Sequence, residues 1–409
     1  MSKGIQVNSE IGKLRKVLVH RPGAEIENIT PDTMKEMLFD DVPFMRIAQE
    51  EHDEFTQLLR DRGAETVYIE TLLADILADP QVKDEFLTAY LTEYRYNETL
   101  QKEIKNYFNT LTPSELVTVI YAGLRKATVG LEDHNLLSFI GNVEDPFILK
   151  PMPNAYFTRD PQAMMGNGLT VNKMTFFVRS PESLITEFVV KYHPMFSENT
   201  HVWLDRNHPN RIEGGDELVL NDHTLAIGVS ERTSSMAIET LAKKLFNDPA
   251  AKFDTIMAVE IPHNHAMMHL DTVFTMINHD QFTVFPGIMD KDSKMNINVL
   301  RPDGHGGLSV EHRTSLKDTL QEVLELPEVD MIETGDGDPI VAPREQWNDG
   351  SNNLAIAPGE VVTYDRNYKS IEIMRAHGIT VHEIRSSELS RGRGGARCMS
   401  QPIWRDALD

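Results

Sequence analysis

One cysteine, Cys398, is the residue whose type and surroundings most directly predict chemistry. The segment 391–397 just before it contains three arginines and three glycines. Nearby cations and backbone N–H groups favour the thiolate, which is the nucleophilic form of a thiol. A lone cysteine is otherwise most often a small core residue, but an Arg-Gly run is unusual beside a core position. We therefore interpret Cys398 as a nucleophile, and the missing Gly-Lys-Ser/Thr ending disfavours a phosphate loop.

A partner for proton transfer is found in the segment 263–271, which precedes the apolar run 272–277. If His269 and Asp271 lie on a strand, their side chains face the same side. A carboxylate beside an imidazole orients the ring and keeps it basic enough to move protons near neutral pH. The plain alternative is a core histidine with a surface aspartate. A metal site formed by His263, His265 and His269 is a further alternative, although the His-Glu-x-x-His pattern is absent.

Two more segments carry carboxylates next to glycine or proline. Glu213 begins the sequence Glu-Gly-Gly-Asp, and Asp160 precedes Pro161. Each segment on its own is typical of a turn, because Gly, Asp and Pro dominate turns. Taken together with one thiol and one imidazole, however, the carboxylates suit a cationic planar substrate. Paired carboxylates accept the forked donors of a guanidinium, whose central carbon Cys398 would attack.

The elements that must position these residues alternate between helix and strand. Apolar residues from Phe44 to Arg62 recur at helical spacing and predict a helix that Gly63 ends. Such steps recur along the chain, and strand-like runs begin near Thr66, His201, Thr255, Val329 and Ile379. Five such steps favour repeated α/β modules. A doubly wound sheet is the alternative, because it also alternates helix and strand.

Residues 72–129 interrupt this alternation. They contain no convincing strand and are expected to form helices at 79–94, 98–108 and 113–124. Asp79-Pro80 and Thr112-Pro113 supply capping oxygens followed by proline, and Glu115 completes a capping box. We therefore expect a helical insertion domain at 72–129 and a catalytic domain formed by 1–71 and 130–409.

Composition excludes several classes of protein. The chain has 409 residues, with 40 Lys and Arg against 63 Asp and Glu, so its net charge is −23. This charge repels nucleic acid and anionic lipid, and no apolar run approaches a membrane span. A single cysteine cannot form an intramolecular disulfide. We expect a reduced, cytoplasmic protein that binds neither nucleic acid nor membrane, and its acidity suits a cationic substrate.

The chain resembles the bacterial arginine deiminases over essentially its whole length. The resemblance rests on Cys398 and on four segments: 38–41 (Leu-Phe-Asp-Asp), 154–160 (Asn-Ala-Tyr-Phe-Thr-Arg-Asp), 213–216 and 269–271. It implies an α/β pentein fold, a five-bladed propeller of pseudo-fivefold symmetry, with an inserted all-helical bundle. It also implies hydrolysis of L-arginine to L-citrulline and ammonia, with no metal and no cofactor. Homo-oligomers are expected.

The same resemblance implies roles for individual residues. Cys398 is the nucleophile, His269 the general acid and base, and Glu213 supports His269, while Asp160 and Asp271 hold the guanidinium. The resemblance also implies substrate binding by Leu38, Asn154, Phe157, Arg179, Arg232, Gly392 and Arg393. Among these, Arg179 and Arg232 are expected near the carboxylate of the substrate. A structural ion pair is the plain alternative for each arginine. Other readings of the same residues are an amidinotransferase, a methylarginine hydrolase or a metal-dependent hydrolase using the segment 263–271.

Overall fold

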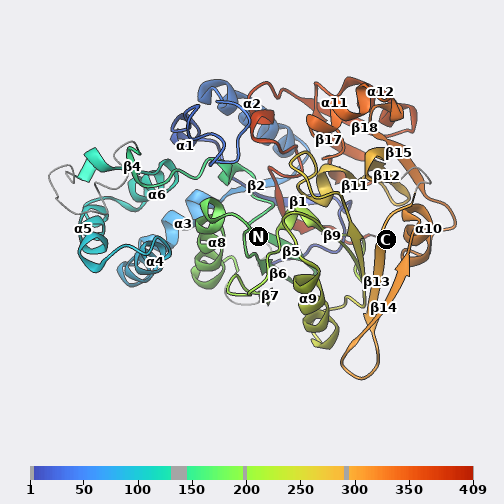
Figure 1. Ribbon diagram of the computed structural model, residues 1–409, viewed down its shortest axis with the longest axis horizontal. Coiled ribbons are helices and arrows are strands. Elements are labelled where there is room, and N and C mark those ends of the chain that lie inside the picture. Colours follow the sequence, from blue (N-terminus) through green and yellow to red (C-terminus); the bar gives the residue numbers. More distant parts are fainter. Residues whose placement is uncertain (1–3, 130–144, 197–199, 290–293, 409) are drawn as a thin grey trace.

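The computed structural model describes residues 4–129, 145–196, 200–289 and 294–408. It is a mixed α/β structure in which a main body of small sheets carries a lobe of helices on one side (Figure 1). The strands of the main body are β1 (Leu14–Val19), β2 (Glu65–Tyr68), β5 (Gln162–Met165), β6 (Gly168–Val171), β7 (His201–Leu204), β8 (Glu217–Val219), β9 (Thr224–Val229), β10 (Thr255–Glu260), β11 (Phe274–Met276), β12 (Gln281–Val284), β13 (Ile297–Pro302), β14 (Leu308–Arg313), β15 (Asp330–Glu333), β16 (Leu354–Ala357), β17 (Glu360–Tyr364), β18 (Thr380–Ile384) and β19 (Gln401–Arg405).

Within the described residues, the same three-stranded pairing occurs five times. A central strand pairs antiparallel with one neighbour and parallel with the other, in the orders β19-β1-β2, β5-β6-β7, β8-β9-β10, β11-β12-β15 and β16-β17-β18. The hairpin β13-β14 extends the third of these into a five-stranded sheet. The five predicted strand runs are confirmed as β2, β7, β10, β15 and β18, which are the parallel strands.

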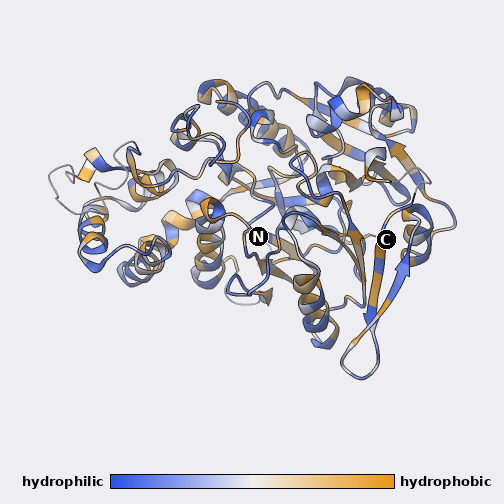
Figure 2. Cartoon of the chain, viewed as in Figure 1, coloured by the Kyte–Doolittle hydropathy of each residue, from blue (hydrophilic) through white to orange (hydrophobic). Residues whose placement is uncertain are grey.

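A helix lies in the connection to each parallel strand, as parallel pairing requires a crossover. These helices are α2 (Met45–Asp61), α8 (Ser180–Tyr192), α9 (Ser235–Asn247), α10 (Leu316–Val323) and α12 (Tyr368–Ala376). The helix predicted from Phe44 to Arg62 is confirmed as α2, which buries Ala48, Phe55 and Leu59 on one face. Helices of the main body show both hydrophilic and hydrophobic residues (Figure 2), as helices packed against a core do.

The helical lobe contains α4 (Pro80–Glu93), α5 (Glu98–Phe108) and α6 (Pro113–Ala122), which confirms the three predicted helices. The Asp79 side chain accepts the N–H groups that open α4, and Thr112 and Glu115 form the predicted capping box of α6. The lobe is joined to the main body by the core, where Phe86 packs edge-on against Phe188 of α8 with 5.2 Å between ring centroids.

The predicted boundaries of the insertion, residues 72 and 129, both fall within helices. Residue 72 lies inside α3 (Ile69–Leu77), and before residue 129 a short strand, β3 (Leu124–Arg125), pairs with β4 (Phe147–Leu149). The expected return to the main body at residue 130 lies outside the described residues. Two further α-helices among the described residues are α1 (Ala24–Glu27) and α11 (Val341–Trp347). Across the part of the chain that is described, no helix is both long and apolar enough to span a membrane.

Candidate active site

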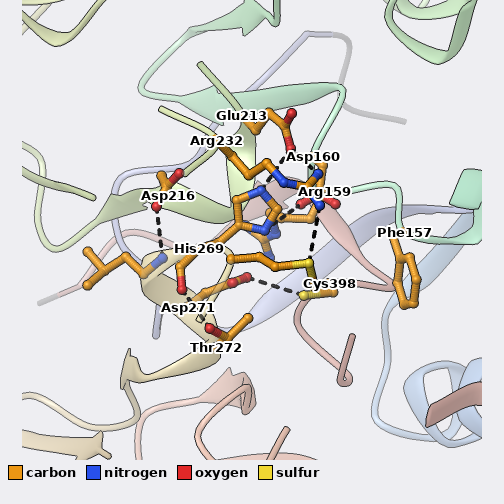
Figure 3. Close-up of polar contacts among 12 residues, drawn as sticks. Phe157, Arg159, Asp160, Glu213, Asp216, Arg232, His269, Asp271, Thr272 and Cys398 are labelled. Carbon is orange, nitrogen blue, oxygen red and sulfur yellow. Dashed lines mark hydrogen bonds and ion pairs between the residues drawn. The ribbon is translucent and has the colours of Figure 1, made fainter. Parts of the chain in front are cut away.

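The predicted catalytic residues lie in turns that precede the opening strands of the three-stranded sheets. Asp160 lies just before β5, Glu213 before β8, His269 and Asp271 before β11, and Cys398 before β19. Each turn therefore occupies the same place in its module. The repeated topology brings together side chains that are far apart in sequence, as Figure 3 shows, with His269 between Glu213 and the pair Asp271 and Cys398.

The local structure of His269 and Asp271 differs from the prediction. They do not share a strand: His269 is extended at the start of the 3₁₀ turn Leu270–Thr272, which contains Asp271, and the strand β11 begins later. The shared-face argument was therefore wrong. The turn instead directs the two side chains to different partners, His269 to Glu213 and Asp271 to Cys398.

His269 is held between two carboxylates. Its Nε2 lies 2.9 Å from Oε2 of Glu213, and its Nδ1 lies 3.8 Å from Oδ1 of Asp160. Burial alone would lower the pKa of His269, but Asp160, the hydrogen bond with Glu213 and the nearby Asp216 raise it to about 9. The imidazole therefore carries a proton at neutral pH. The same neighbourhood holds the pKa of Glu213 well below its usual range despite burial, chiefly through Arg232 and His269.

Gly215 allows the imidazole to occupy this position. An added Cβ at Gly215 would lie 2.6 Å from Cγ of His269, closer than carbon atoms pack. The Glu-Gly-Gly-Asp sequence therefore has a steric reason in this structure, beyond the ability of glycine to form turns.

Cys398 is a buried, protonated thiol in this structure. Its Sγ donates to Oδ2 of Asp271 at 3.5 Å, and the residue is 3% exposed. Burial, followed by the negative charges of Asp271 and Asp160, raises the pKa of Cys398 well above its ordinary value. Of the three arginines near it in sequence, Arg397 opposes this rise but is outweighed.

Arg397 thus acts in the predicted direction, because it lowers the pKa of Cys398, but its effect is smaller than those of burial and of the nearby aspartates. All three arginines are paired with carboxylates. Arg397 pairs with Asp271 and Glu10, Arg391 with Asp41 and Glu388, and Arg393 with Asp40. A guanidinium that is paired with a carboxylate contributes little net field at a third group.

Two aspartates present unused acceptors in the site. Oδ2 of Asp160 lies 2.5 Å from Nη1 of Arg179, and Oδ2 of Asp271 lies 2.7 Å from Nη1 of Arg397. The other oxygen of each aspartate, Oδ1, is buried and has no hydrogen-bond partner among the described residues. Buried carboxylate oxygens are costly without donors, so the pair is arranged to accept N–H groups from a cation.

The two arginines expected near a substrate carboxylate have different surroundings. Arg179 is buried, and its N–H groups donate to Asp160, to Glu182 and to two backbone carbonyls. In this structure it holds Asp160, and contact with a substrate would require these bonds to break. Arg232 lies 3.4 Å from Glu213 and stacks over Phe176, while its buried Nε has no partner in the part of the chain that the structure describes. Arg232 thus keeps a free donor.

The remaining predicted residues belong to segments that meet over the site. Asn154 donates to the backbone carbonyl of Met37 and so holds the segment that carries Leu38. Leu38 itself has a left-handed backbone conformation, with φ of 63°. A Cβ at Gly392 would overlap Phe157, so these two segments are in close contact.

Arg393 completes this cover. Its Nη1 lies 3.3 Å from Oδ2 of Asp40, and its guanidinium carbon lies 3.4 Å from the ring centroid of Trp347. Asp40 is also 3.0 Å from His265, which links a third segment. The predicted catalytic residues are all at most 3% exposed, so the site is closed to solvent in this structure.

The alternative metal site finds no support in the arrangement of side chains. Within the described ranges, no three His, Cys, Asp or Glu side chains converge as metal ligands. His265 is directed to Asp40 on the surface, whereas His269 is directed to the buried Glu213.

Sequence reasoning missed several residues that hold the site. Glu10 accepts two hydrogen bonds from Arg397, at 2.9 and 3.1 Å, and Glu182 pairs with Arg179 at 2.7 Å. Asn352 contacts the backbone of both Cys398 and Asp271. No local signal identifies Glu10 or Asn352, because their partners are far away in the chain; Glu10 and Arg397 are 387 positions apart. Glu182 is only three positions from Arg179, so helical spacing is the signal that could have found it.

The chain is similar to known proteins over most of its length. The family profile described as Arginine deiminase matches residues 35–405. The chain is 61% identical to the arginine deiminase of Lactococcus lactis subsp. cremoris, with all of both chains covered, and 57% identical to that of Limosilactobacillus fermentum, again over both whole chains.

Among solved structures, the N-terminal domain of the cyanobacterial arginine dihydrolase ArgZ matches with a TM-score of 0.55 at 12% identity, covering 96% of this chain and 99% of the other. The dimethylarginine dimethylaminohydrolase of Pseudomonas aeruginosa, solved with citrulline, matches with a TM-score of 0.52 at 14% identity, covering 95% of this chain and 99% of the other. These likenesses show a pentein-like fold. With the family match over most of the sequence, they show that the chain belongs to the arginine deiminase family.

Proposed function

We propose that the chain hydrolyses L-arginine to L-citrulline and ammonia through a covalent adduct on Cys398. The observation that carries this proposal is the combination of one buried thiol with a protonated His269 and two aspartates whose Oδ1 atoms lack donors. A guanidinium supplies the N–H groups that these oxygens lack, and its charge balances the excess of buried carboxylates.

Substrate binding prepares the nucleophile. Asp160 and Asp271 hold the guanidinium flat, with its central carbon presented to Sγ of Cys398. The substrate's positive charge then opposes the effect of the two aspartates, which together with burial raise the pKa of Cys398. Binding therefore lowers the pKa of the thiol, and the thiolate forms where the electrophile is already in place.

The first chemical step forms a C–S bond and releases ammonia. The thiolate attacks the guanidinium carbon, and His269 gives its proton to the departing nitrogen, so the C–N bond breaks and NH₃ leaves. A thiouronium adduct remains on Cys398. Glu213, which is bonded to His269 at 2.9 Å, stabilises the imidazolium before the transfer and orients the ring.

The second step consumes one water molecule. His269, now neutral, accepts a proton from water as the oxygen attacks the adduct carbon. The C–S bond breaks, the ureido group of citrulline forms and the thiolate is regenerated. As the ureido carbonyl forms, the hydroxyl of the adduct loses its proton, and the thiolate regains from solvent the proton that it gave up on substrate binding. Over both steps the arginine cation and water therefore give citrulline and ammonium, and the thiol and imidazolium return to their starting states.

The proposal extends to architecture and assembly. The five sheets with one pairing pattern support a five-bladed α/β propeller of pseudo-fivefold symmetry, formed by 1–71 and 130–409, with 72–129 as a helical insertion. Arg232 serves the carboxylate end of the substrate, as does Arg179 once its bonds to Asp160 and Glu182 break on binding, and Leu38, Asn154, Phe157, Gly392 and Arg393 line the pocket. The protein acts in the cytoplasm as a homo-oligomer.

A citrulline assay on the wild type and on Cys398→Ala in parallel tests the proposed function. We expect the wild type to release citrulline and ammonia in equal amounts from free L-arginine and the variant to release neither. Methylamine released from methylarginine in preference, or turnover that requires an amine acceptor, would instead identify a methylarginine hydrolase or an amidinotransferase. Full activity of Cys398→Ala would remove the thiol from the mechanism.

A further inference from the structure

Four of the five turns that precede an opening strand carry predicted catalytic residues. The fifth turn precedes β16 and connects it to α11. Its residues Asp349, Ser351, Asn352 and Asn353 are all at most 2% exposed. Because the five turns occupy equivalent places in their modules, this turn also faces the site, although it carries none of the predicted catalytic residues.

Asn352 is the residue of this turn that reaches the catalytic segments. Its Oδ1 accepts the backbone N–H of Cys398 at 3.0 Å, and its Nδ2 donates to the backbone carbonyl of Asp271 at 3.0 Å. One partner is a donor and the other an acceptor, so the orientation of the amide is determined. Asn352 is 0% exposed, and water therefore cannot replace either bond.

The backbone beside Cys398 is shaped to make this contact. A Cβ at Gly395 would lie 2.9 Å from Oδ1 of Asn352, so only glycine lets the loop come so close. The carbonyl of Gly395 accepts the N–H of Met399 at 3.1 Å, which closes the turn that contains Cys398. Within the described part of the chain, the N–H of Cys398 donates only to Asn352.

We propose that Asn352 is a positioning residue for the reaction: its one side-chain amide fixes the distance between the nucleophile Cys398 and the guanidinium-holding Asp271. The inference rests on the proposed function. Cys398 and Asp271 approach the substrate from different modules and are 127 positions apart in the chain, so the backbone alone does not set the distance between them. A side chain that bonds both backbones acts as the common reference for both.

The neighbouring Asn353 provides a matched control. It is also buried, at 1% exposure, and its Nδ2 also makes two hydrogen bonds, to Oγ1 of Thr283 and to the carbonyl of Gly350. Neither of these partners is a catalytic segment. The variants Asn352→Ala and Asn353→Ala therefore remove the same group from the same turn, and differ in whether the lost bonds reach Cys398 and Asp271.

The first measurement is steady-state citrulline formation by both variants, with melting temperatures measured alongside. A misplacement of about 1 Å in a catalytic group costs about 100-fold in rate, so we expect kcat of Asn352→Ala to fall by about 10- to 100-fold while KM changes by less than about threefold. Asn353→Ala, at a similar melting temperature, keeps kcat within about threefold of the wild type.

The second measurement does not depend on turnover. Cys398 is the only cysteine in the chain, so its alkylation by iodoacetamide is read without ambiguity. We expect Asn352→Ala to be alkylated faster than Asn353→Ala at the same temperature below each melting point, because the turn carrying Cys398 is released. If Asn352→Ala does not fold, Asn352→Asp replaces it, with Asn353→Asp as the control. Asn352→Asp keeps the acceptor for the Cys398 N–H but loses the donor to Asp271.

The two measurements separate the inference from the proposed function. Equal kcat and equal alkylation rates in the paired variants would overturn the positioning role while the wild type still forms citrulline. A wild type that forms no citrulline would overturn the proposed function, and the alkylation rates would still show whether Asn352 holds Cys398.

Discussion

The close approach of Gly215 to His269 gives a quantitative prediction. An added Cβ would lie 2.6 Å from Cγ of the imidazole, whereas carbon contacts are favourable from about 3.5 Å. In Gly215→Ala the ring must therefore move by about 0.9 Å, the difference of these two distances. A shift of that size away from the turn breaks the 2.9 Å bond between Nε2 of His269 and Glu213.

The expected loss of activity follows from this displacement. A misplacement of about 1 Å costs about 100-fold in rate, which corresponds to about 2.7 kcal/mol in kcat/KM. Overpacking of the core should lower the free energy of unfolding by about 1–3 kcal/mol. Gly168→Ala is the control outside the site: its Cβ would lie 2.6 Å from the ring of Trp203 and still closer to the backbone oxygen of His201, so its steric conflict is at least as severe.

The assay compares kcat/KM for citrulline formation and urea unfolding in both variants. We expect similar losses of stability, with a loss of activity confined to Gly215→Ala. The pKa of His269, followed by its ring NMR signals, should also fall from about 9 toward its ordinary value as the Glu213 bond is lost. If Gly215→Ala keeps kcat/KM within about threefold of Gly168→Ala, the argument that this glycine positions the imidazole is refuted.

Three further predictions concern buried charge. Replacing Arg179 by methionine leaves the buried carboxylates of Glu182 and Asp160 without this partner, so the free energy of unfolding in urea should fall by about 3–5 kcal/mol. The exposed Arg15, changed to methionine as a control, should cost less than about 1 kcal/mol. Equal losses in the two variants would contradict a structural role for the buried ion pairs of Arg179. Alkylation of Cys398 without substrate should keep accelerating above pH 9, since burial and the site's aspartates raise its pKa, and a plateau below pH 8 would be inconsistent with that environment. The pKa of His269 is raised to about 9 from an unfolded value of about 6.5, so protonated His269 stabilises the fold by about 3 kcal/mol below pH 6.5, and this stabilisation is lost as pH rises through 9. The difference in unfolding free energy between wild type and His269→Asn should therefore shrink from pH 6.5 to 9. A difference that stays constant would refute the raised pKa of His269.

Much of the architecture was predictable because its signals are local. The caps at Asp79 and Thr112 and the apolar face of α2 depend on residues within a few positions of one another. The alternation of helix and strand is read in the same way. The placement of His269 and Asp271 on a strand was wrong because a 3₁₀ turn and a strand of three residues cannot be told apart by a two-residue spacing.

The electrostatic state of the site was not predictable in this way. Arg397 is next to Cys398 in the sequence, and proximity suggested that it favours the thiolate. In the folded protein its guanidinium donates to Glu10 and Asp271, and although Arg397 lowers the pKa of the thiol, burial and the aspartates raise that pKa by more. Asn352 carried no signal at all, since an asparagine between a helix and a strand is ordinary in a turn.

The sequence by itself determined which chemical groups are available and the order of the modules that carry them, because residue types and periodicity are properties of neighbouring positions. Only the tertiary structure decided which of those groups are charged, which acceptors are left without donors, and which residues hold the catalytic ones. The physical reason is that burial and ion pairing depend on distance in space, and here Cys398, Asp271, Asn352 and Glu10 come from parts of the chain that only the fold brings together.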